Sequence, residues 1–341
     1  MKYKQLRLGD LAEFTTGKLN ANKAVEDGKY PFFTTSPETL RINNFAFDQD
    51  AILLGGNNAN GVFQLKRYTG KFNAYQRTYV ISVVKENIIN NDYLYYALMP
   101  KLVELQNKSL GTATKFITKR ILENLLIKVP NNYNEMERRA TYLRTIDNKI
   151  QLNKQLNANL LELAKTLFSE EFSSNEEVLF SNYLLPKRGK NLLKKNVVSG
   201  EFPVIAGGLK PAAFHNSYNT KAPVITISAS GANAGYVQIW GQPVWSSDSS
   251  YIDTSITKDI YFWYLLLKKY QKQIFDAQTG SAQPHIYPKH IGNLLIPNIS
   301  EDSIKNFNIT ITPIFKKIFQ NKNENNKLKA IKNSLLIKYF N

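Results

Sequence analysis

Hydrophobic positions recur every three or four residues along two long stretches of the chain. In the first stretch the recurring positions, one of them an asparagine, are Ile146, Ile150, Asn153, Leu156, Leu160, Leu163 and Leu167. This spacing is close to that of the a and d positions of a coiled coil. It predicts a helix from about residue 134 to residue 172, roughly 60 Å long at 1.5 Å per residue. Asn134, followed three positions later by Glu137, is the capping pattern that we expect at its start.

The second stretch repeats this pattern 168 positions later, at Ile314, Ile318, Asn321, Leu328, Ile331 and Leu335. Thr312 and Pro313 form an N-cap and first-turn pair, which predicts a helix start there. Such a helix is too long to bury its stripe within one small domain, and an asparagine in the same seam position of both copies would fix the register of a pair. We therefore predict that the two helices pair in antiparallel orientation. The predicted pairing positions are Ile146, Ile150, Asn153, Leu160 and Leu167 with Ile314, Ile318, Asn321, Leu328 and Leu335. The alternative is that each stripe packs on its own globular domain.

The segment before each long helix is rich in glycine turns and short β-type runs, and it occurs twice. Gly17 and Gly28 recur as Gly189 and Gly200, 172 positions later. The run GTATKFITKRILENLLIKVP, which begins at Gly111, recurs as GSAQPHIYPKHIGNLLIPN. The repeat is much too long for a solenoid unit. We predict an α+β fold in which two pseudo-symmetric globular α/β domains are joined by two long antiparallel helices. The expected globular domains are residues 1–132 and 173–300, and the expected helical regions are residues 133–172 and 301–341.

Composition narrows the class of protein. The 341 residues are 43% hydrophobic, which suits two globular domains. The absence of cysteine excludes disulfides and thiolate metal sites, and the three histidines have no metal-ligand spacing. No apolar run approaches the roughly 18 residues of a membrane span, and no signal sequence is visible, so we expect a soluble cytoplasmic protein. The net charge of +17 indicates a polyanionic partner. A lysine- and asparagine-rich genome is the alternative explanation of that charge.

Motifs that would carry catalysis are missing. The sequence has no phosphate-binding loop, no GxGxxG that opens a helix and no Asn-Pro-Pro-aromatic tetrapeptide. It has no PD…ExK constellation, and SASGANAG lacks the GxSxG form of a serine hydrolase. We therefore expect no catalytic residue, no metal site and no cofactor in this chain. The missing motifs favour a binding role over a catalytic one.

Two polar segments in each copy are candidates for DNA binding: a glycine- and asparagine- or serine-rich loop, and the repeated run before the helix. Asparagine can contact adenine with two hydrogen bonds, and cationic side chains contact phosphates. Ordinary hairpin turns and solvated charges are the alternative interpretation. The frame residues match between copies while the polar residues differ, as expected if the copies read different sequences. The candidates are Asn57, Asn58, Asn60, Thr112, Thr114, Lys115, Lys119, Arg120, Ser228, Ser230, Asn233, Ser281, Gln283, His285, Lys289 and His290.

A tandem repeat of globular domain plus long helix, with G-[ST]-A…I…LLI…P before each helix, resembles the DNA specificity (S) subunit of type I restriction–modification systems. The resemblance covers essentially the whole chain. Leu8-Gly9-Asp10 matches the usual start of that family's target recognition domain, whereas the second copy has Phe180-Ser181-Asn182 there. The resemblance implies that each domain reads one half of a bipartite site in double-stranded DNA. Half-sites one helical turn apart need recognition elements roughly 34 Å apart, a spacing that the helices could set.

The same resemblance implies partners. The helices would dock two methyltransferase (M) subunits, which use S-adenosylmethionine. Motor–nuclease (R) subunits, joined through the M subunits, would use ATP and Mg²⁺. Two other classes remain as alternatives: a single-chain restriction–modification enzyme, or a fragment of one, and a non-catalytic coiled-coil adaptor.

Overall fold

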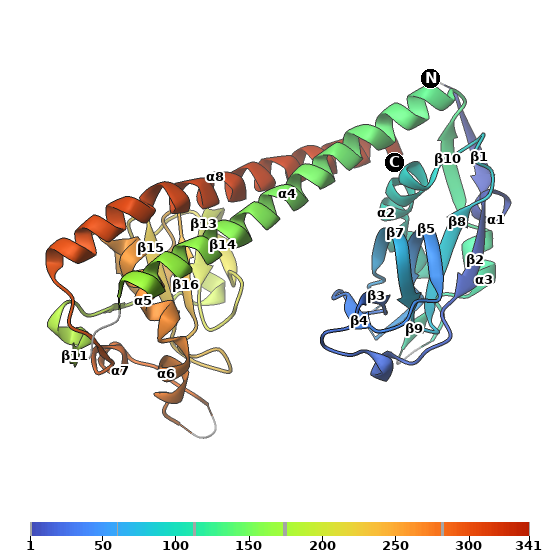
Figure 1. The fold of residues 1–341 in the computed structure, drawn as a ribbon. Coiled ribbons are helices and arrows are strands. Elements are labelled where there is room, and N and C mark those ends of the chain that lie inside the picture. The colour runs from blue at the N-terminus through green and yellow to red at the C-terminus, as the bar shows by residue number, and fades with distance from the viewer. Residues whose placement is uncertain (1, 60, 112–113, 173–175, 281–282, 341) are drawn as a thin grey trace. The chain divides into compact units, whose positions relative to one another are not determined.

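The structure, a computed structural model, describes all residues except 1, 60, 112–113, 173–175, 281–282 and 341. The chain divides into two compact units, and each long helix (Figure 1) contributes one part to each unit. The first unit comprises Met1–Gln151 and Asn326–Asn341, and the second comprises Leu152–Asn325. No helix among the described residues is long and apolar enough to cross a membrane.

The first unit is built around a six-stranded sheet with the strand order β2-β8-β5-β7-β3-β4. Its strands are β2 (Ala12–Thr16), β3 (Tyr30–Phe33), β4 (Leu40–Ile42), β5 (Phe47–Gly55), β7 (Leu65–Ala74) and β8 (Thr78–Val83). Two short pairs complete the strands: β1 (Tyr3–Arg7) with β10 (Leu126–Pro130), and β6 (Asn57–Asn58) with β9 (Lys115–Phe116). The short helices are α1 (Leu8–Leu11), η1 (Ala21–Lys23), α2 (Asn91–Lys108) and α3 (Lys119–Glu123). Tyr93 and Leu98 of α2 are fully buried in one core with Ile52 and Ile81 of the sheet.

The second unit repeats this plan with smaller sheets, ordered β12-β18-β15-β16 and β14-β13-β17, and the pair β11-β19. Its strands are β11 (Glu177–Leu179), β12 (Lys187–Arg188), β13 (Ser199–Ile205), β14 (Ala213–His215), β15 (Val224–Ser228), β16 (Val237–Trp240), β17 (Trp245–Ser246), β18 (Ser249–Asp253) and β19 (Leu295–Pro297). Its short helices are η2 (Phe180–Asn182), η3 (Lys194–Asn196), α5 (Ile260–Lys269), α6 (Gln271–Asp276) and α7 (Pro288–Gly292). Residues 260–267 of α5 are all buried, as expected of a helix that is apolar on every side.

The pairing of strands confirms the internal duplication. The parallel pair Phe33↔Ala74 recurs as Ile205↔Ser246, and Leu54↔Tyr79 recurs as Thr226↔Tyr251, all 172 positions later. The duplicated glycines have a steric cause. A Cβ atom at position 17 would lie 1.7 Å from the carbonyl oxygen of residue 74, and one at position 189 would lie 2.5 Å from that of residue 246. Only glycine lets the backbone approach its neighbour this closely.

The long helices α4 (Tyr133–Glu171) and α8 (Glu301–Phe340) pair in antiparallel orientation, as predicted. Within the second unit the Asn153 amide donates to Asn325 Oδ1 at 3.0 Å, and the Asn321 amide donates to Asn157 Oδ1 at 2.8 Å. These two hydrogen bonds are each other's equivalents under the shift of 168 positions. Within the first unit Lys332 Nζ donates to Asp147 Oδ2 at 2.7 Å.

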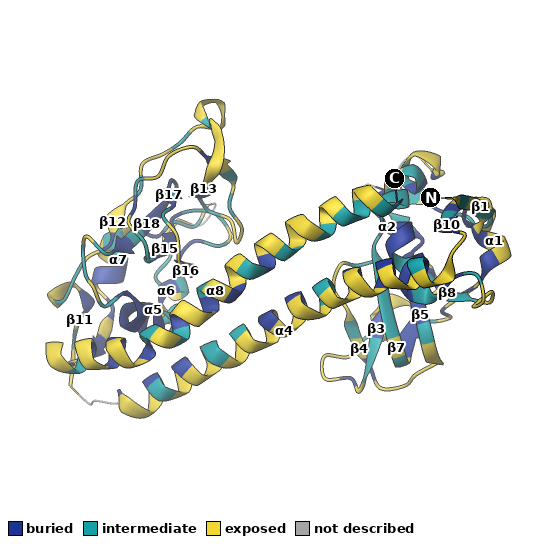
Figure 2. Cartoon of the chain, turned by 90° about the horizontal axis from the view of Figure 1, so that it is seen from above, coloured by how far each residue is buried: buried dark blue, intermediate teal, exposed yellow. Residues whose placement is uncertain are grey.

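The seam between the helices differs in detail from the prediction. Ile150, Asn153, Ile318 and Asn321 are buried, whereas Leu156, Leu163 and Ile331 are exposed. Ala164 and Phe168 are buried in their place on α4. Ile146, Leu160, Leu167, Ile314, Leu328 and Leu335 are half-buried. An α-helix has 3.6 residues per turn, so a stripe drawn with a strict 3.5-residue period turns by about 20° per heptad and leaves the buried face along the helix. Figure 2 shows this uneven burial along both helices.

The N-cap residues predicted for both helices, Asn134 and Thr312, were wrong. The second helix begins at Glu301 and runs through Thr312 and Pro313. Proline cannot donate to the carbonyl of Ile309, but that residue is exposed, so water can satisfy the free acceptor. The first helix is capped two residues earlier than predicted, because Asn132 Oδ1 accepts the backbone N–H of Glu135 at 3.2 Å.

Candidate nucleic-acid interface

Each globular part begins with a residue anchored in the same way. The backbone N–H of Leu8 donates to the carbonyl of Leu125 at 2.8 Å, and that of Phe180 donates to the carbonyl of Leu294 at 2.8 Å. Leu8 and Phe180 are both fully buried. The divergent sequence at 180–182 therefore occupies the same place as Leu8-Gly9-Asp10.

A small residue is needed where this first turn meets the short helix before the long one. A Cβ atom at Gly9 would lie 3.0 Å from Glu123 Cβ, and a Cβ atom at Gly292 would lie 3.3 Å from Ser181 Cβ. Positions 9 and 181 are equivalent in the repeat, and so are positions 123 and 292. In the first unit the first turn supplies the glycine, Gly9, whereas in the second unit the short helix supplies it, Gly292.

In the first unit the structure brings the two candidate polar segments together. Asn57 and Asn58 pair with Phe116 and Lys115 as the two-stranded ladder β6-β9. The backbone N–H of Ile117 extends this contact to the carbonyl of Gly56 at 2.8 Å. A segment that follows β5 and a segment almost 60 residues later therefore form one surface.

The second unit makes the same arrangement with different side chains. Ser230 forms a bridge with His285, the Gly231 N–H donates to the carbonyl of Pro284 at 3.0 Å, and the Ile286 N–H donates to that of Ala229 at 2.9 Å. The polar loop and the repeated run are again joined.

The glycine that opens the repeated run is required in both copies. Gly111 and Gly280 each have φ of +93°, a left-handed conformation that side chains disfavour. A Cβ atom there would lie 2.2 Å from the carbonyl oxygen of Thr114 or 2.7 Å from that of Gln283. The glycine therefore lets the run fold back on itself and present the polar residues that follow.

The candidate side chains differ in accessibility. Thr114, Lys119, Arg120, Gln283 and Lys289 are exposed, and Asn57, Asn58, Lys115, Ser230, Asn233, His285 and His290 are half-buried. Ser228 is only 4% exposed and belongs to β15, so we remove it from the candidate interface. Asn60, Thr112 and Ser281 lie outside the described residues.

The cationic candidates near the long helices lie on the short helices α3 and α7. Lys119 is 3.8 Å from Glu123 in an exposed ion pair, which contributes little to stability. His290 Nδ1 accepts the backbone N–H of Tyr287 at 3.4 Å. Burial and the neighbouring charge of Lys289 lower the pKa of His290, which favours its neutral form.

Sequence reasoning missed a group of residues beside Ser230. Arg188 Nη2 donates to Asp248 Oδ1 at 2.9 Å, and the other carboxylate oxygen of Asp248 accepts the Ser230 hydroxyl. The guanidinium of Arg188 lies 5.9 Å from the ring centre of Tyr287, which stacks on His285. The repeated dipeptide Gly189-Lys190 adjoins Arg188, but no pattern in the sequence relates Arg188 to Asp248, 60 positions away.

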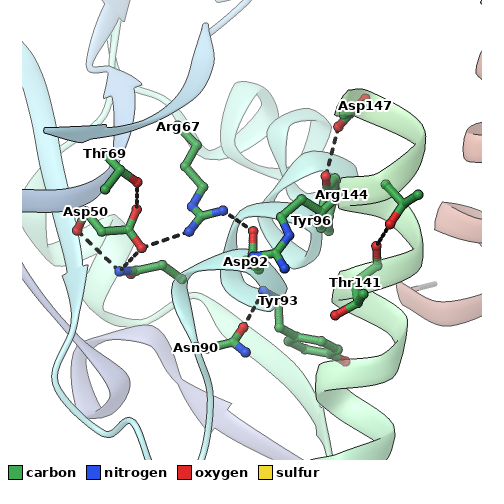
Figure 3. Close-up of polar contacts among 12 residues, drawn as sticks. Asp50, Arg67, Thr69, Asn90, Asp92, Tyr93, Tyr96, Thr141, Arg144 and Asp147 are labelled. Carbon is green, nitrogen blue, oxygen red and sulfur yellow. Dashed lines mark hydrogen bonds and ion pairs between the residues drawn. The ribbon is translucent and has the colours of Figure 1, made fainter. Parts of the chain in front are cut away.

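The first globular part is fastened to α4 by ion pairs and hydrogen bonds (Figure 3). Asp92 of α2 accepts from Arg67 and, at 2.7 Å, from Arg144 of α4. Arg67 also donates to Asp50 at 2.8 Å. The Tyr96 hydroxyl donates to Asp147 of α4 at 2.9 Å.

The second globular part is fastened to the long helices by aromatic rings. Phe315 of α8, the equivalent of Asp147, stacks on Tyr261 with ring centres 4.7 Å apart and planes 7° apart. Phe168 of α4 lies 5.4 Å from Phe262. Within the described residues no cluster of three or more histidine, aspartate or glutamate side chains is placed to hold a metal ion.

Comparisons with known proteins show which family these features resemble. A family model described as the type I restriction modification DNA specificity domain matches residues 1–162. The chain is 41% identical over 129 residues to the EcoDI specificity subunit of Escherichia coli, a match that spans 38% of this chain and 28% of that protein. It is 24% identical over 360 residues to the putative type I specificity subunit S.MpnORF638P of Mycoplasma pneumoniae, which covers 98% and 94% of the two chains.

The fold itself has a solved counterpart. The crystal structure of a type I restriction–modification S subunit from M. genitalium matches with a TM-score of 0.71 at 21% identity, over 98% of this chain and 95% of that one. That likeness confirms the predicted fold class.

Proposed function

We propose that this chain is a DNA specificity subunit of the type I restriction–modification family, which it resembles, and that each of its globular domains reads one half of a bipartite DNA site. The family's specificity subunit is non-catalytic, so the chemistry of methylation and cleavage belongs to partner subunits. Double-stranded DNA is the ligand that the charge of +17 also favours.

One observation carries the proposal: the two units share a backbone frame at the candidate interface but not its side chains. The bridge Asn57↔Phe116 in the first unit corresponds to Ser230↔His285 in the second. Lys115 of the first unit likewise has a neutral counterpart in the second. A conserved frame with different polar groups is what two readers of different half-sites need, because the frame positions the side chains and the side chains specify the bases.

The contacts divide by chemistry. Lys115, Lys119, Arg120 and Lys289 would bind phosphates and supply affinity for any sequence. Asn58, Gln283 and His285 carry donors and acceptors that suit base edges in the major groove. Thr114, Ser230, Asn233 and His290 could add hydrogen bonds to either.

The long helices are the proposed docking surface for two methyltransferase subunits. Leu152, Leu156 and Leu163 of α4 are exposed, and their spacing places them on one face of the helix. An exposed apolar stripe on a helix is typical of a surface that a partner covers. Motor–nuclease subunits would join through the methyltransferases, and S-adenosylmethionine, ATP and Mg²⁺ would be bound there. The complex would act in the cytoplasm.

A domain exchange tests the proposal. Residues 1–132 are replaced by the matching domain of another specificity subunit, and methylated sites are mapped on a plasmid library in the presence of the methyltransferase subunit. We expect one half-site to change and the other to stay as it was. A change in both half-sites, or in neither, would contradict the reading of one half-site by each domain.

Point variants separate the two kinds of contact. Lys119→Ala should weaken binding to all sequences and lower the salt slope by about one. Gln283→Ala should cost roughly 1–3 kcal/mol at one base position and leave the salt slope unchanged. A chain that binds the methyltransferase but shifts no DNA at low salt would instead support the coiled-coil adaptor.

A further inference from the structure

The side chain of Arg188 is oriented by two contacts beside the candidate interface of the second unit. Its Nη2 is bonded to Asp248 at 2.9 Å, and its guanidinium lies 5.9 Å from the ring centre of Tyr287. The same carboxylate accepts the hydroxyl of Ser230, which bridges to His285. Arg188 is therefore part of one continuous surface with two of the candidate residues.

Arg188 makes no other side-chain hydrogen bond within the described part of the chain. The side chain is 41% exposed, although Asp248 and Tyr287 restrict its movement. An arginine that is already oriented loses less rotamer freedom when it forms two parallel hydrogen bonds. The O6 and N7 atoms of guanine are the pair of acceptors that matches this fork in the major groove.

The pairing with Asp248 also distinguishes base reading from phosphate binding. A guanidinium beside a carboxylate carries little net charge, so the pair attracts phosphates weakly. The directional N–H donors of Arg188 remain. Such a pair suits a contact that supplies specificity and little general affinity.

We propose that Arg188 reads a guanine in the half-site recognised by the second domain, an inference that rests on the function proposed above. The equivalent positions in the first unit are Thr16 and Gln76, and the Gln76 amide donates to Asn20 at 2.7 Å. The first unit therefore has no arginine–aspartate pair at this place. The guanine contact belongs to one half-site only.

The test is selection from a randomised DNA duplex pool by the complex of this chain with its methyltransferase subunit, followed by sequencing of the bound fraction. Arg188→Ala should lower the preference for guanine at one position of one half-site by roughly 5- to 150-fold. Arg188→Lys should not restore it, because an ammonium group lacks the planar fork. Asp248→Asn should weaken the same preference and, by leaving a net positive charge, steepen the salt dependence of binding.

Lys187→Ala is the matched control, since Lys187 is the exposed neighbour of Arg188 in β12. Its loss should leave the guanine preference unchanged. The inference is overturned if Arg188→Ala keeps the wild-type preference at every position, or loses affinity equally for all sequences. If Arg188→Ala does not fold, Arg188→Lys decides by the same criterion. A wild-type complex that selects no sequence at all would overturn the proposed function itself, and this inference with it.

Discussion

The stability of the first unit should depend on the ion pairs of one carboxylate, that of Asp92, whereas the stability of the second unit should not depend on the equivalent carboxylate. Asp92 lies in the first turn of α2, its side chain is 12% exposed, and its two oxygens accept from Arg67 and Arg144. Its equivalent, Asp259 at the start of α5, has no ion pair among the described residues. Burial raises the pKa of Asp259, while the charge of Lys305 acts weakly against this.

The loss in free energy of unfolding when the Asp92 carboxylate is removed depends on how exposed its two arginine partners are. A hydrogen bond between charged groups contributes about 1.5–3 kcal/mol when buried, whereas an exposed ion pair contributes about 0.2–1 kcal/mol. Arg67 is 22% exposed and Arg144 is 48% exposed. Asp92→Asn should therefore destabilise the first unit by about 2–4 kcal/mol. The loss should be no larger, because Arg67 keeps Asp50 as a partner. Asp259→Asn removes a charge that burial already disfavours, so it should cost nothing or stabilise slightly.

Native-state hydrogen exchange read by mass spectrometry can follow the two units separately, which a single melting curve of a two-unit chain cannot. In Asp92→Asn, protection of amides in α2 should fall roughly 30- to 700-fold, the equivalent of about 2–4 kcal/mol. Protection in α5 should not change. Asp259→Asn should leave both regions as in the wild type. Equal losses in the two variants, or an undiminished α2 in Asp92→Asn, would refute the reasoning.

Three further predictions concern stability. Burial raises the pKa of Asp50, but the hydrogen bonds and charge of Arg67 lower it further, to a net value below the ordinary 3.8. The contribution of the Asp50 carboxylate to the free energy of unfolding is present above the unfolded pKa and is lost as pH falls through the folded pKa. Asp50→Asn lacks this contribution, so in thermal melts it should lose less stability than wild type between pH 7 and pH 3. Asn153→Ala should destabilise the helix pair by about 1–3 kcal/mol, because it removes a buried hydrogen bond; denaturation that leaves the helical circular dichroism as stable as in wild type would contradict this. Gly292→Glu should destabilise the second unit, since its Cβ would lie 2.5 Å from Leu185 Cδ2, and adding Ser181→Gly should recover part of the loss in the same exchange experiment.

Sequence patterns predicted the features that depend on backbone geometry. The duplicated glycines at 17 and 189 and at 111 and 280 mark places where a Cβ atom cannot fit, and such places recur with the fold. The helix pair followed from the asparagines at equivalent positions, which do bond across the seam.

Features that depend on tertiary packing were not predictable. Pro313 indicates a helix start by local propensity, but packing of Phe307 and Ile311 on the second globular part extends the helix before it. The exposure of Leu156 and Leu163 follows from the drift of the seam, which a spacing rule cannot resolve. Arg188 and Asp248 are brought together only by the pairing of β12 with β18, and nothing in their local sequence indicates it.

The different chemistry of the two helix attachments limits how such a chain could be reassembled from parts. In the second unit the ring of Tyr261 packs on Phe315, and the equivalent of Phe315 in the first unit is Asp147 of α4. If the second globular domain were moved to the first half, Tyr261 would therefore lie against Asp147. The half-buried carboxylate of Asp147 would then lose the Tyr96 hydroxyl and face an aromatic ring, with Lys332 as its remaining donor, which is a costly arrangement. Recombination between two such genes should therefore succeed when the crossover lies within the long helices, so that each domain is inherited together with the stretch of helix that holds it.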